Sequence, residues 1–373
     1  MKTAHIFYSF VISSLCFTCT SSNPTSDTTS TEEGSDMQST EATSLRYEQE
    51  KHLENLKQLT AGGDNAEAYF SFDDQQLVFQ ATNPEWDVEC DQIFIMDPKG
   101  GALTEVPTML STGLGRTTCS FFMPGNETIL YASTHLGGEE CPDAPRSFEG
   151  KYVWPVFSSF DIFVADLEGN ILQQLTDEPG YDAEATLSPD GSMIVFTSDR
   201  SGDLELYTMN TDGSNVQQVT SGLGYDGGAF FSPDGTKLIF RASRPQTEEE
   251  VKVYQDLLAE GLVQPGAMEL YVCNVDGSDL RQITDLGGAN WAPYFHPSGE
   301  KIVFSSNHHS ETGRKFNLFM INLDGTGLEQ ITFDDTFDAF PMFSYSGEQL
   351  VFSSNRFNGG TRATNVFLAD WVD

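Results

Sequence analysis

Residues 187–196, LSPDGSMIVF, recur almost unchanged as residues 231–240, FSPDGTKLIF. Each copy starts with a large apolar residue, continues through a Ser-Pro-Asp-Gly turn and ends in a run of apolar residues. Four looser copies keep this order of residue types: 70–79, 122–131, 295–304 and 343–352. The part of the 373-residue chain that follows residue 54 is therefore built from six copies of one unit.

The residues after each copy indicate further strands. Residues 205–210, ELYTMN, alternate in character, an Asp212-Gly213 turn follows, and residues 216–220, VQQVT, close the unit. Alternation with a period of two between Asp-Gly turns predicts antiparallel strands joined by tight hairpins. Radial repetition of such units, without strand–helix–strand patterns, is the propeller solution to unpaired sheet edges. We therefore predict an all-β fold, a six-bladed β-propeller of four-stranded antiparallel blades.

The two ends of the repeat region indicate how the ring closes. The sixth copy stops after its third strand at residues 365–370 and lacks an equivalent of residues 328–332, LEQIT. A matching segment, LKQLT, lies at residues 56–60. We expect this N-terminal strand to complete the last blade.

The Ser-Pro-Asp-Gly, Asp-Gly-Ser and closing Gln-Ile-Thr or Gln-Leu-Thr elements, found in register, resemble the WD-like TolB-type six-bladed propeller repeats of bacterial envelope proteins. The resemblance covers about residues 55–373. It implies a scaffold role in the cell envelope without identifying a partner. Some polysaccharide lyases also resemble this plan and place a divalent metal with His and Asp groups on a propeller.

The N-terminus has the pattern of an export signal. A short charged start, Met1-Lys2, precedes an apolar run at 4–17 that is too short to span a bilayer. Residues 20–44 are rich in Ser, Thr, Asp and Glu, which predicts a flexible tether. A cysteine before a polar tether resembles a lipoprotein signal of a Gram-negative bacterium. Lipidation at Cys19, with Cys16 as a second candidate, and ordinary cleavage near Ser22 remain alternatives.

These patterns divide the chain into an export signal at 1–19, a tether at 20–44 and a propeller at 45–373. The expected location is the periplasm, or the outer membrane through a lipid anchor on the N-terminus.

The charge excludes two classes of partner. The chain has 56 acids against 19 bases, a formal net charge of -37. Residues 1–44 hold five of the acids and one base, so the propeller itself keeps -33. Such a surface repels phosphate backbones and anionic headgroups, which argues against nucleic acid and against membrane contact other than a lipid anchor.

The blades differ mainly in the loops between their second and third strands. The long loops are 84–91, 136–160, 245–268 and 309–316, and we expect them on one face, called the loop-rich face below. In the third loop, Thr247 and Glu250 form a capping box and Gly261 can end a short helix. Residues 152–157, YVWPVF, are too apolar to stay exposed, so they cover the channel mouth or form a partner surface.

The loop-rich face also receives two sets of polar positions, which together we call the mouth ring. The starts of the inner strands are Asn65, Thr117, Asp182, Asp226, Asn290 and Asp338, with Glu67 and Glu184 two residues on and Trp291 beside Asn290. The ends of the second strands are Asn83, His135, Arg200, Arg244, His308 and Arg356. Either these groups form ion pairs and hydrogen bonds between blades, or the mouth binds a polar or cationic ligand, a peptide or a divalent cation such as Ca²⁺. Carboxylates at Asp182, Asp226 and Asp338 would suit a hard cation.

Other sequence signals of chemistry are weak. His308-His309 with Glu311 has metal-ligand residue types without a sustained spacing motif. The sequence contains no Gly-x-Ser-x-Gly elbow, no Walker loop and no two paired Cys-x-x-Cys motifs.

Export permits disulfides among the four cysteines of the propeller. Cys90 and Cys141 occupy equivalent loops of adjacent blades, so we predict this pair, with Cys119 as the competing partner. Cys273 lies inside an alternating strand and is expected to be a buried thiol.

The sequence favours a non-catalytic cell-envelope propeller, without a required cofactor, that binds an envelope protein, peptide or polar ligand on its loop-rich face. The alternative is a propeller enzyme of the lyase or hydrolase class with a divalent metal at the channel mouth. Binding is favoured because no base, nucleophile and orienting group can be assigned by spacing.

Overall fold

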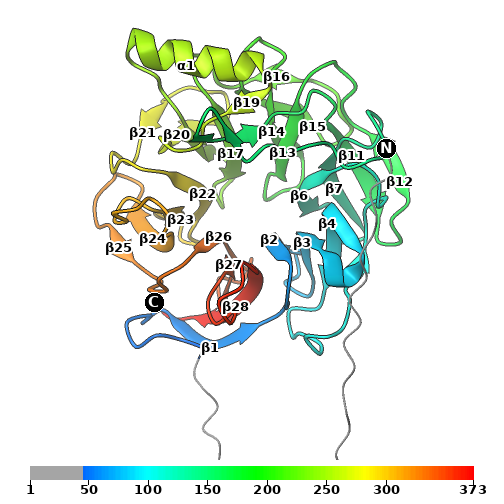
Figure 1. Cartoon of the computed structure of the whole chain (residues 1–373), viewed down its shortest axis with the longest axis vertical. Helices are drawn as coiled ribbons and strands as arrows, with labels where there is room; N and C mark the ends of the chain where they lie inside the picture. The colour runs from blue at the N-terminus through cyan, green and yellow to red at the C-terminus, as the bar shows by residue number, and fades with distance from the viewer. Residues whose placement is uncertain (1–44) are drawn as a thin grey trace, which may run out of the picture. The chain divides into compact units, whose positions relative to one another are not determined.

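The computed structural model describes residues 45–373, which form six four-stranded antiparallel sheets arranged as blades around an axis (Figure 1). The all-β six-bladed propeller expected from the repeats is confirmed. The expected export signal, Cys19 and the tether lie outside the described residues.

Each blade runs outward from the axis in sequence order. Blade 1 contains β2 (Asp64–Phe70), β3 (Leu77–Asn83), β4 (Val88–Met96) and β5 (Thr108–Met109). Blade 2 contains β6 (Thr117–Phe122), β7 (Thr128–Ser133), β11 (Asp161–Asp166) and β12 (Ile171–Gln174). Blade 3 contains β13 (Asp182–Leu187), β14 (Met193–Ser198), β15 (Glu205–Asn210) and β16 (Gln217–Gln218).

Blades 4 to 6 repeat this arrangement. Blade 4 contains β17 (Asp226–Phe231), β18 (Lys237–Ala242), β20 (Glu269–Asn274) and β21 (Arg281–Gln282). Blade 5 contains β22 (Asn290–Phe295), β23 (Lys301–Ser306), β24 (Asn317–Asn322) and β25 (Glu329–Gln330). Blade 6 contains β26 (Asp338–Phe343), β27 (Gln349–Ser354), β28 (Asn365–Trp371) and, on its outside, β1 (Leu53–Gln58).

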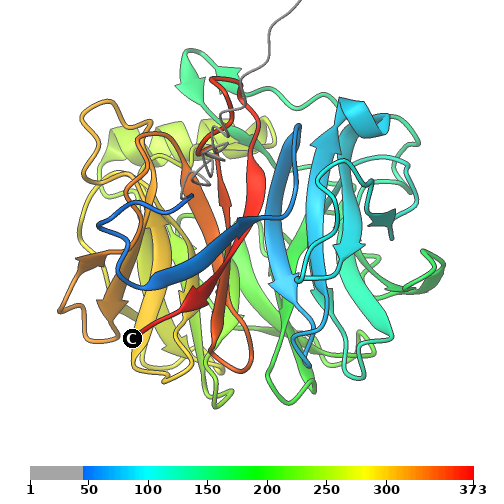
Figure 2. The same ribbon diagram turned by 90° about the horizontal axis from the view of Figure 1, so that it is seen from below.

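Strand β1 closes the ring as the sequence predicted, by pairing antiparallel with β28 (Figure 2). Just beyond the strand, Leu59 N donates to Val366 O at 2.8 Å, and Val366 N donates to the hydroxyl of Thr60 at 2.9 Å. The last blade is therefore assembled from both ends of the propeller.

The core lies between and within the blades. The second strand of each blade buries one aromatic ring completely. These residues are Phe79, Tyr131, Phe196, Phe240, Phe304 and Phe352. The preceding turns are held by their own side chains. In residues 188–193, for example, the Ser188 hydroxyl donates to Asp190 at 2.6 Å and accepts from the backbone of Met193 at 3.0 Å. The repeated motif thus fixes a tight hairpin before each apolar strand.

The long insertions add small elements to the loop-rich face. Helix α1 (Glu248–Ala259) starts with the expected capping box between Thr247 and Glu250. The other elements are η1 (Pro84–Trp86), β8 (Ser147–Phe148), β9 (Lys151–Tyr152), β10 (Trp154–Pro155) and β19 (Leu262–Val263). Between residues 45 and 373, no helix combines the length and apolarity needed to span a membrane.

Candidate functional site

In blades 3, 4 and 6 the mouth ring is built from ion pairs within one blade. Arg200 Nη2 lies 2.9 Å from Asp182, Arg356 Nη2 lies 3.1 Å from Asp338, and Arg244 pairs with Asp226 in the same way. In blade 3 the hairpin register sets Asp182 opposite Ser198. Arg200, two positions after Ser198, therefore lies beside the start of the inner strand of its own blade. The expectation of ion pairs between blades is therefore wrong for these three arginines.

A serine at the end of the second strand orients Arg200 and Arg356, whereas blade 4 has Ala242 at this position. The same Ser-x-Arg or Ser-x-His contact occurs in four blades, between Ser133 and His135, Ser198 and Arg200, Ser306 and His308, and Ser354 and Arg356. The guanidinium groups also lie over aromatic rings of the blade, as Arg200 lies 5.3 Å from the Phe196 ring centroid. Such cation–π contacts hold the arginines against the blade core.

The aspartates of the ring are almost inaccessible to solvent. Asp182, Asp226 and Asp338 are at most 2% exposed. Burial raises the pKa of Asp182 and Asp226, although the paired arginines act in the opposite direction. Because each carboxylate already has an arginine partner, the ring offers little free negative charge to a ligand.

Blade 6 adds a third charged group that the repeat did not predict. Glu50, in the segment before β1, accepts from Arg356 Nη1 at 3.1 Å and from Nη2 at 2.9 Å. Glu50, Asp338 and Arg356 have no exposed side-chain surface. This arrangement ties the N-terminal segment to the loop-rich end of blade 6.

The remaining ring residues in blade 5 also have structural contacts. Asn290 donates to Met268 O at 2.9 Å and to Glu269 at 3.0 Å, and it accepts from Ser306 at 2.7 Å. His308 packs on the Phe319 ring at 4.6 Å, and burial lowers its pKa. Within residues 45–373, no three His, Cys, Asp or Glu side chains are grouped so that they could hold a metal ion.

A second ring of residues lies deeper in the channel. Each inner strand contains a bulge whose residue has a positive φ of 46° to 60°. We call these six positions the bulge ring: Glu67, Cys119, Glu184, Gly228, Ala292 and Phe340. All six line one cavity of about 20 Å³, which has room for a single water molecule. The bulge is common to all blades, so the side chain at each position decides the chemistry of the channel.

The polar members of the bulge ring come from blades 1 to 3. The Cys119 thiol donates to Glu67 at 3.0 Å. Burial raises the pKa of Glu67 and, together with this carboxyl group, raises the pKa of Cys119 well above its ordinary value. The thiol therefore stays protonated and is not an activated nucleophile.

Glu184 is paired with an arginine that the sequence analysis missed. Arg241 of β18 donates to Glu184 and, at 2.9 Å, to the Tyr225 hydroxyl, which itself donates to Glu184 at 2.6 Å. Burial alone would lower the pKa of Arg241, but Glu184 raises it above its ordinary value. A Cβ at Gly228 would lie 2.5 Å from Arg241 Nη1, so this glycine makes room for the guanidinium.

A comparison of the repeats could have identified Arg241. The equivalent positions of the second strands in the other blades are Gln80, Ala132, Thr197, Ser305 and Ser353. Only blade 4 of the propeller carries a cation there.

Aromatic side chains cover the channel on the loop-rich face. Strand β10, from the long loop of blade 2, pairs with β19 of blade 4 and places Trp154 5.2 Å above the Arg241 guanidinium. Successive contacts of 4.4 to 6.3 Å between ring centroids then lead across the mouth through Trp154, Trp291, Phe316, Phe337 and Phe340. Residues 152–157 therefore pack over the mouth, which is one of the two alternatives that the sequence left open.

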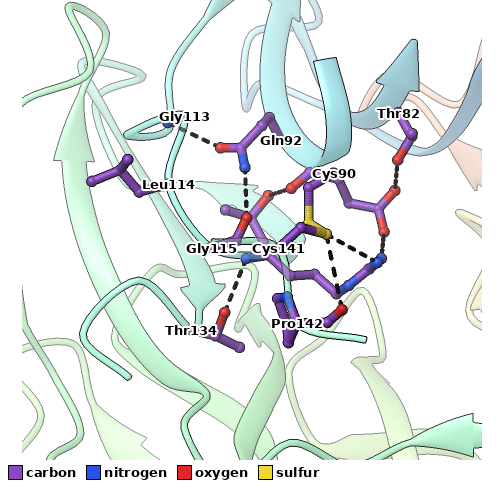
Figure 3. Close-up of a disulfide and its surroundings, with 12 residues drawn as sticks. Thr82, Cys90, Gln92, Gly113, Leu114, Gly115, Thr134, Cys141 and Pro142 are labelled. Carbon is purple, nitrogen blue, oxygen red and sulfur yellow. Dashed lines mark hydrogen bonds and ion pairs between the residues drawn. A yellow bond between two sulfur atoms is a disulfide. The ribbon is translucent and has the colours of Figure 1, made fainter. Parts of the chain in front are cut away.

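The structure contains the disulfide expected between Cys90 and Cys141, which joins β4 of blade 1 to the long loop of blade 2 (Figure 3). Beside it, Thr82 donates to Asp91 at 2.5 Å, and Asp91 pairs with Arg116. Cys119, the alternative partner, is a free thiol, and so is the buried Cys273.

Comparison with known proteins supports the propeller fold. Residues 157–262 match the sequence profile of the family described as TolB beta propeller domain. The putative TolB from Agrobacterium tumefaciens aligns with a TM-score of 0.54 and 18% identity over 83% of this chain and 91% of that chain. TolB from Acinetobacter baumannii aligns with a TM-score of 0.50 and 18% identity over 83% of this chain and 63% of that chain.

An enzyme also contains this architecture. Hydrazine synthase from Kuenenia stuttgartiensis aligns with a TM-score of 0.51 and 14% identity over 72% of this chain and 38% of that chain. The chain spans less than two thirds of the Acinetobacter protein and of the synthase chain. These identities establish a shared fold alone. The chain is a six-bladed β-propeller that shares its fold with the two TolB structures.

Proposed function

We propose that this protein is a non-catalytic scaffold of the cell envelope that binds a protein or peptide on its loop-rich face. The observation that carries this proposal is the closed mouth. Its three aspartates are paired with arginines, and a row of aromatic rings lies across the channel on the loop-rich face, so these carboxylates are not open to a ligand there. The outer surface of the loops is what remains for a partner.

That surface exposes large apolar side chains beside the ends of the strands. They are Leu114, Leu136, Tyr152, Leu223 and Phe357, each between 39% and 61% exposed. Aromatic and aliphatic groups of this kind supply the central contacts of protein interfaces. The resemblance of the repeats to TolB-type propellers implies a scaffold role of this kind.

Binding can be tested with matched surface variants. Leu136→Asp and Tyr152→Asp change the loop-rich face, whereas Leu280→Asp and Leu328→Asp change residues of similar exposure in turns at the opposite end of the blades. We expect only the first pair to lose a partner captured from an envelope extract by the tagged propeller. Loss with the second pair alone would place the interface on the other face and refute the proposal.

The location in the envelope is part of the proposal. The Cys90–Cys141 disulfide is consistent with an oxidising compartment, and the N-terminal pattern is consistent with export. Metabolic labelling with a palmitate analogue, compared with Cys19→Ala, would distinguish a lipoprotein anchored in the outer membrane from a free periplasmic protein.

The alternative of a metal-dependent propeller enzyme makes a different prediction. Elemental analysis would find a divalent metal in stoichiometric amount, and Asp182→Ala or His308→Ala would remove it. We expect neither result, because Asp182 is already bonded to Arg200 and His308 to Ser306.

A further inference from the structure

Five of the six junctions between neighbouring blades follow one pattern on the loop-rich face. The backbone N–H of the first inner-strand residue donates to the carbonyl just before the third strand of the preceding blade. These bonds join Asn65 to Thr364, Asp182 to Phe160, Asp226 to Leu204, Asn290 to Met268 and Asp338 to Phe316, at 2.9 to 3.1 Å. Each bond sets the first side chain of an inner strand beside the first side chain of a neighbouring third strand.

In three junctions, at least one of these two side chains is an amide. Asn290 donates to Glu269 at 3.0 Å between blades 4 and 5, and Asn317 donates to Asp338 at 3.1 Å between blades 5 and 6. Between blades 6 and 1 the corresponding residues are Asn365 and Asn65. An amide nitrogen supplies the donor that a carboxylate partner requires.

The two junctions on either side of blade 3 have carboxyl groups at both positions. They combine Asp161 with Asp182, and Glu205 with Asp226. Glu205 Oε1 accepts from Gly222 N at 2.6 Å, whereas its Oε2 is buried and has no hydrogen-bond partner in the described part of the chain. The Glu205 residue is only 2% exposed. Asp161 accepts from Gln174 and Thr176 at 3.3 Å, and Asp182 accepts from Arg200 at 2.9 Å. Two ionised carboxylates have no donor to share with each other, so a proton held by one carboxyl relieves the repulsion within each pair.

The surrounding charges leave each pair with excess negative charge. Arg200 bonds to Asp182 and Arg244 bonds to Asp226. A third acid acts on each pair, since Asp177 lies near Asp161 and Asp203 lies near Glu205. Three acids thus face one base at each junction.

The pKa values follow from this arrangement. Burial, and then the neighbouring carboxylate, raise the pKa of Asp161 to about 6. The same two causes raise the pKa of Glu205 to about 7, against the opposing hydrogen bond from Thr220.

We propose that the two junctions around blade 3 act as proton-dependent latches, in which a proton on one carboxyl group of each pair holds blade 3 to blades 2 and 4. Loss of these protons loosens blade 3 at the loop-rich face. The loosening reaches the channel cover, because β13 carries Glu184, which bonds to Arg241 beneath Trp154. The device does not depend on which partner the propeller binds.

The sign of the pH effect follows from the raised pKa values. A carboxyl whose pKa is higher in the folded than in the unfolded protein stabilises the fold below its unfolded value and loses this contribution as pH rises through its folded value. The ordinary values are 3.8 for Asp161 and 4.5 for Glu205. The latches should therefore weaken between about pH 4 and pH 7.

Amide variants at the two junctions test the latches. Asp161→Asn and Glu205→Gln reproduce the arrangement that Asn317 and Asn365 provide in blades 5 and 6. Glu269→Gln is the matched control, because its partner Asn290 is already an amide. The assays are melting temperature from pH 5 to pH 8 at constant ionic strength, and hydrogen exchange of β13 and β17 corrected for intrinsic rates.

We expect the wild type and the control to melt at lower temperature as pH rises, and the double variant to lose at least half of that fall. In the wild type and the control, exchange in β13 and β17 should accelerate at least ~10-fold from pH 5 to pH 8, because each unit of pKa shift that is lost over this range corresponds to a factor of ~10. The double variant should show no such change. Equal pH dependence in all three proteins would refute the latches.

A direct titration keeps the proposal testable if the double variant does not fold. The carboxyl carbon of Glu205, followed by NMR in the wild type, should titrate near pH 7, and Asp226→Asn should move this titration downward. Titration near the ordinary value would overturn the proposal.

Discussion

Replacing Glu50 by alanine should destabilise the whole propeller, although the residue lies in the segment that precedes its first strand. Its carboxylate accepts four hydrogen bonds. Two come from Arg356 at 3.1 and 2.9 Å, and two come from the backbone of Tyr47 at 2.9 Å and of Phe333 at 3.2 Å. The variant would leave the buried Arg356 with one carboxylate partner, Asp338, and two backbone donors without an acceptor.

The size of the effect can be worked out from these contacts. Removing one partner of a buried ion pair costs ~3–5 kcal/mol. Arg356 keeps its bonds to Asp338 at 3.1 Å and to the Ser354 hydroxyl at 3.0 Å, so the lower end of that range, ~3 kcal/mol, is appropriate. The 329 residues from 45 to 373 correspond to an unfolding entropy of ~0.7 kcal/mol/K. The melting temperature should therefore fall by ~4 °C.

The matched control is Glu48→Ala, which removes the same charge two residues earlier from an exposed position. Differential scanning calorimetry at pH 7 measures both variants against the wild type. We expect Glu48→Ala to stay within ~1 °C of the wild type. Equal melting temperatures for the two variants would show that Glu50 does not anchor the N-terminal segment, and the account of blade 6 given above would be wrong.

Three further predictions follow from the closure, the disulfide and the channel. Deletion of residues 55–60 should lower the melting temperature by more than Glu50→Ala does, because it exposes the edge of β28, and an unchanged value would contradict ring closure. Peptide mapping without reductant should recover Cys90 linked to Cys141, and reduction should cost up to ~4 kcal/mol for a separation of 51 residues; free thiols at both positions would exclude the bond. Gly228→Ala should destabilise the protein by ~1–3 kcal/mol more than Gly202→Ala in urea unfolding. Both glycines have a positive φ, but only at Gly228 does a Cβ collide with Arg241, so equal losses would show that the guanidinium moves aside.

The propeller fold could be predicted because its determinants are local and repeated. Each Ser-Pro-Asp-Gly hairpin is held by bonds within six residues, such as those from Ser188 to Asp190 and Met193. The closing strand could be predicted because its sequence matches the strand that the sixth copy lacks. Such signals need no knowledge of distant contacts.

For the mouth ring, the repeat predicted the positions of the residues but the sequence analysis did not assign their partners. Its positions follow from the repeat, but its partners follow from the hairpin register. Asp182 and Arg200, Asp226 and Arg244, and Asp338 and Arg356 are each 18 residues apart. This constant separation was visible in the sequence and indicates pairing inside one blade.

Contacts between distant segments could not be predicted from the repeat. Glu50 meets Arg356 across 306 residues, and Trp154 of blade 2 meets Arg241 of blade 4. Neither Glu50 nor Trp154 belongs to the repeated unit, so no internal comparison reveals its partner. The channel cover and the anchoring of the N-terminal segment therefore required the structure.

The acidic residues of the propeller include two sets that differ in burial and in charge state. Those of the Asp-Gly turns, such as Asp212 and Asp276, are exposed and accept bonds from the serine two residues later, which lowers their pKa. They remain ionised and repel anionic partners without affecting the channel. The acids at the junctions of blade 3 are different, because they are buried in pairs and outnumber their arginines. A uniform change of charge on the turns should thus alter solubility and association, whereas a change at Asp161 or Glu205 should alter the response of the fold to pH. The two sets can be varied independently, since no residue belongs to both.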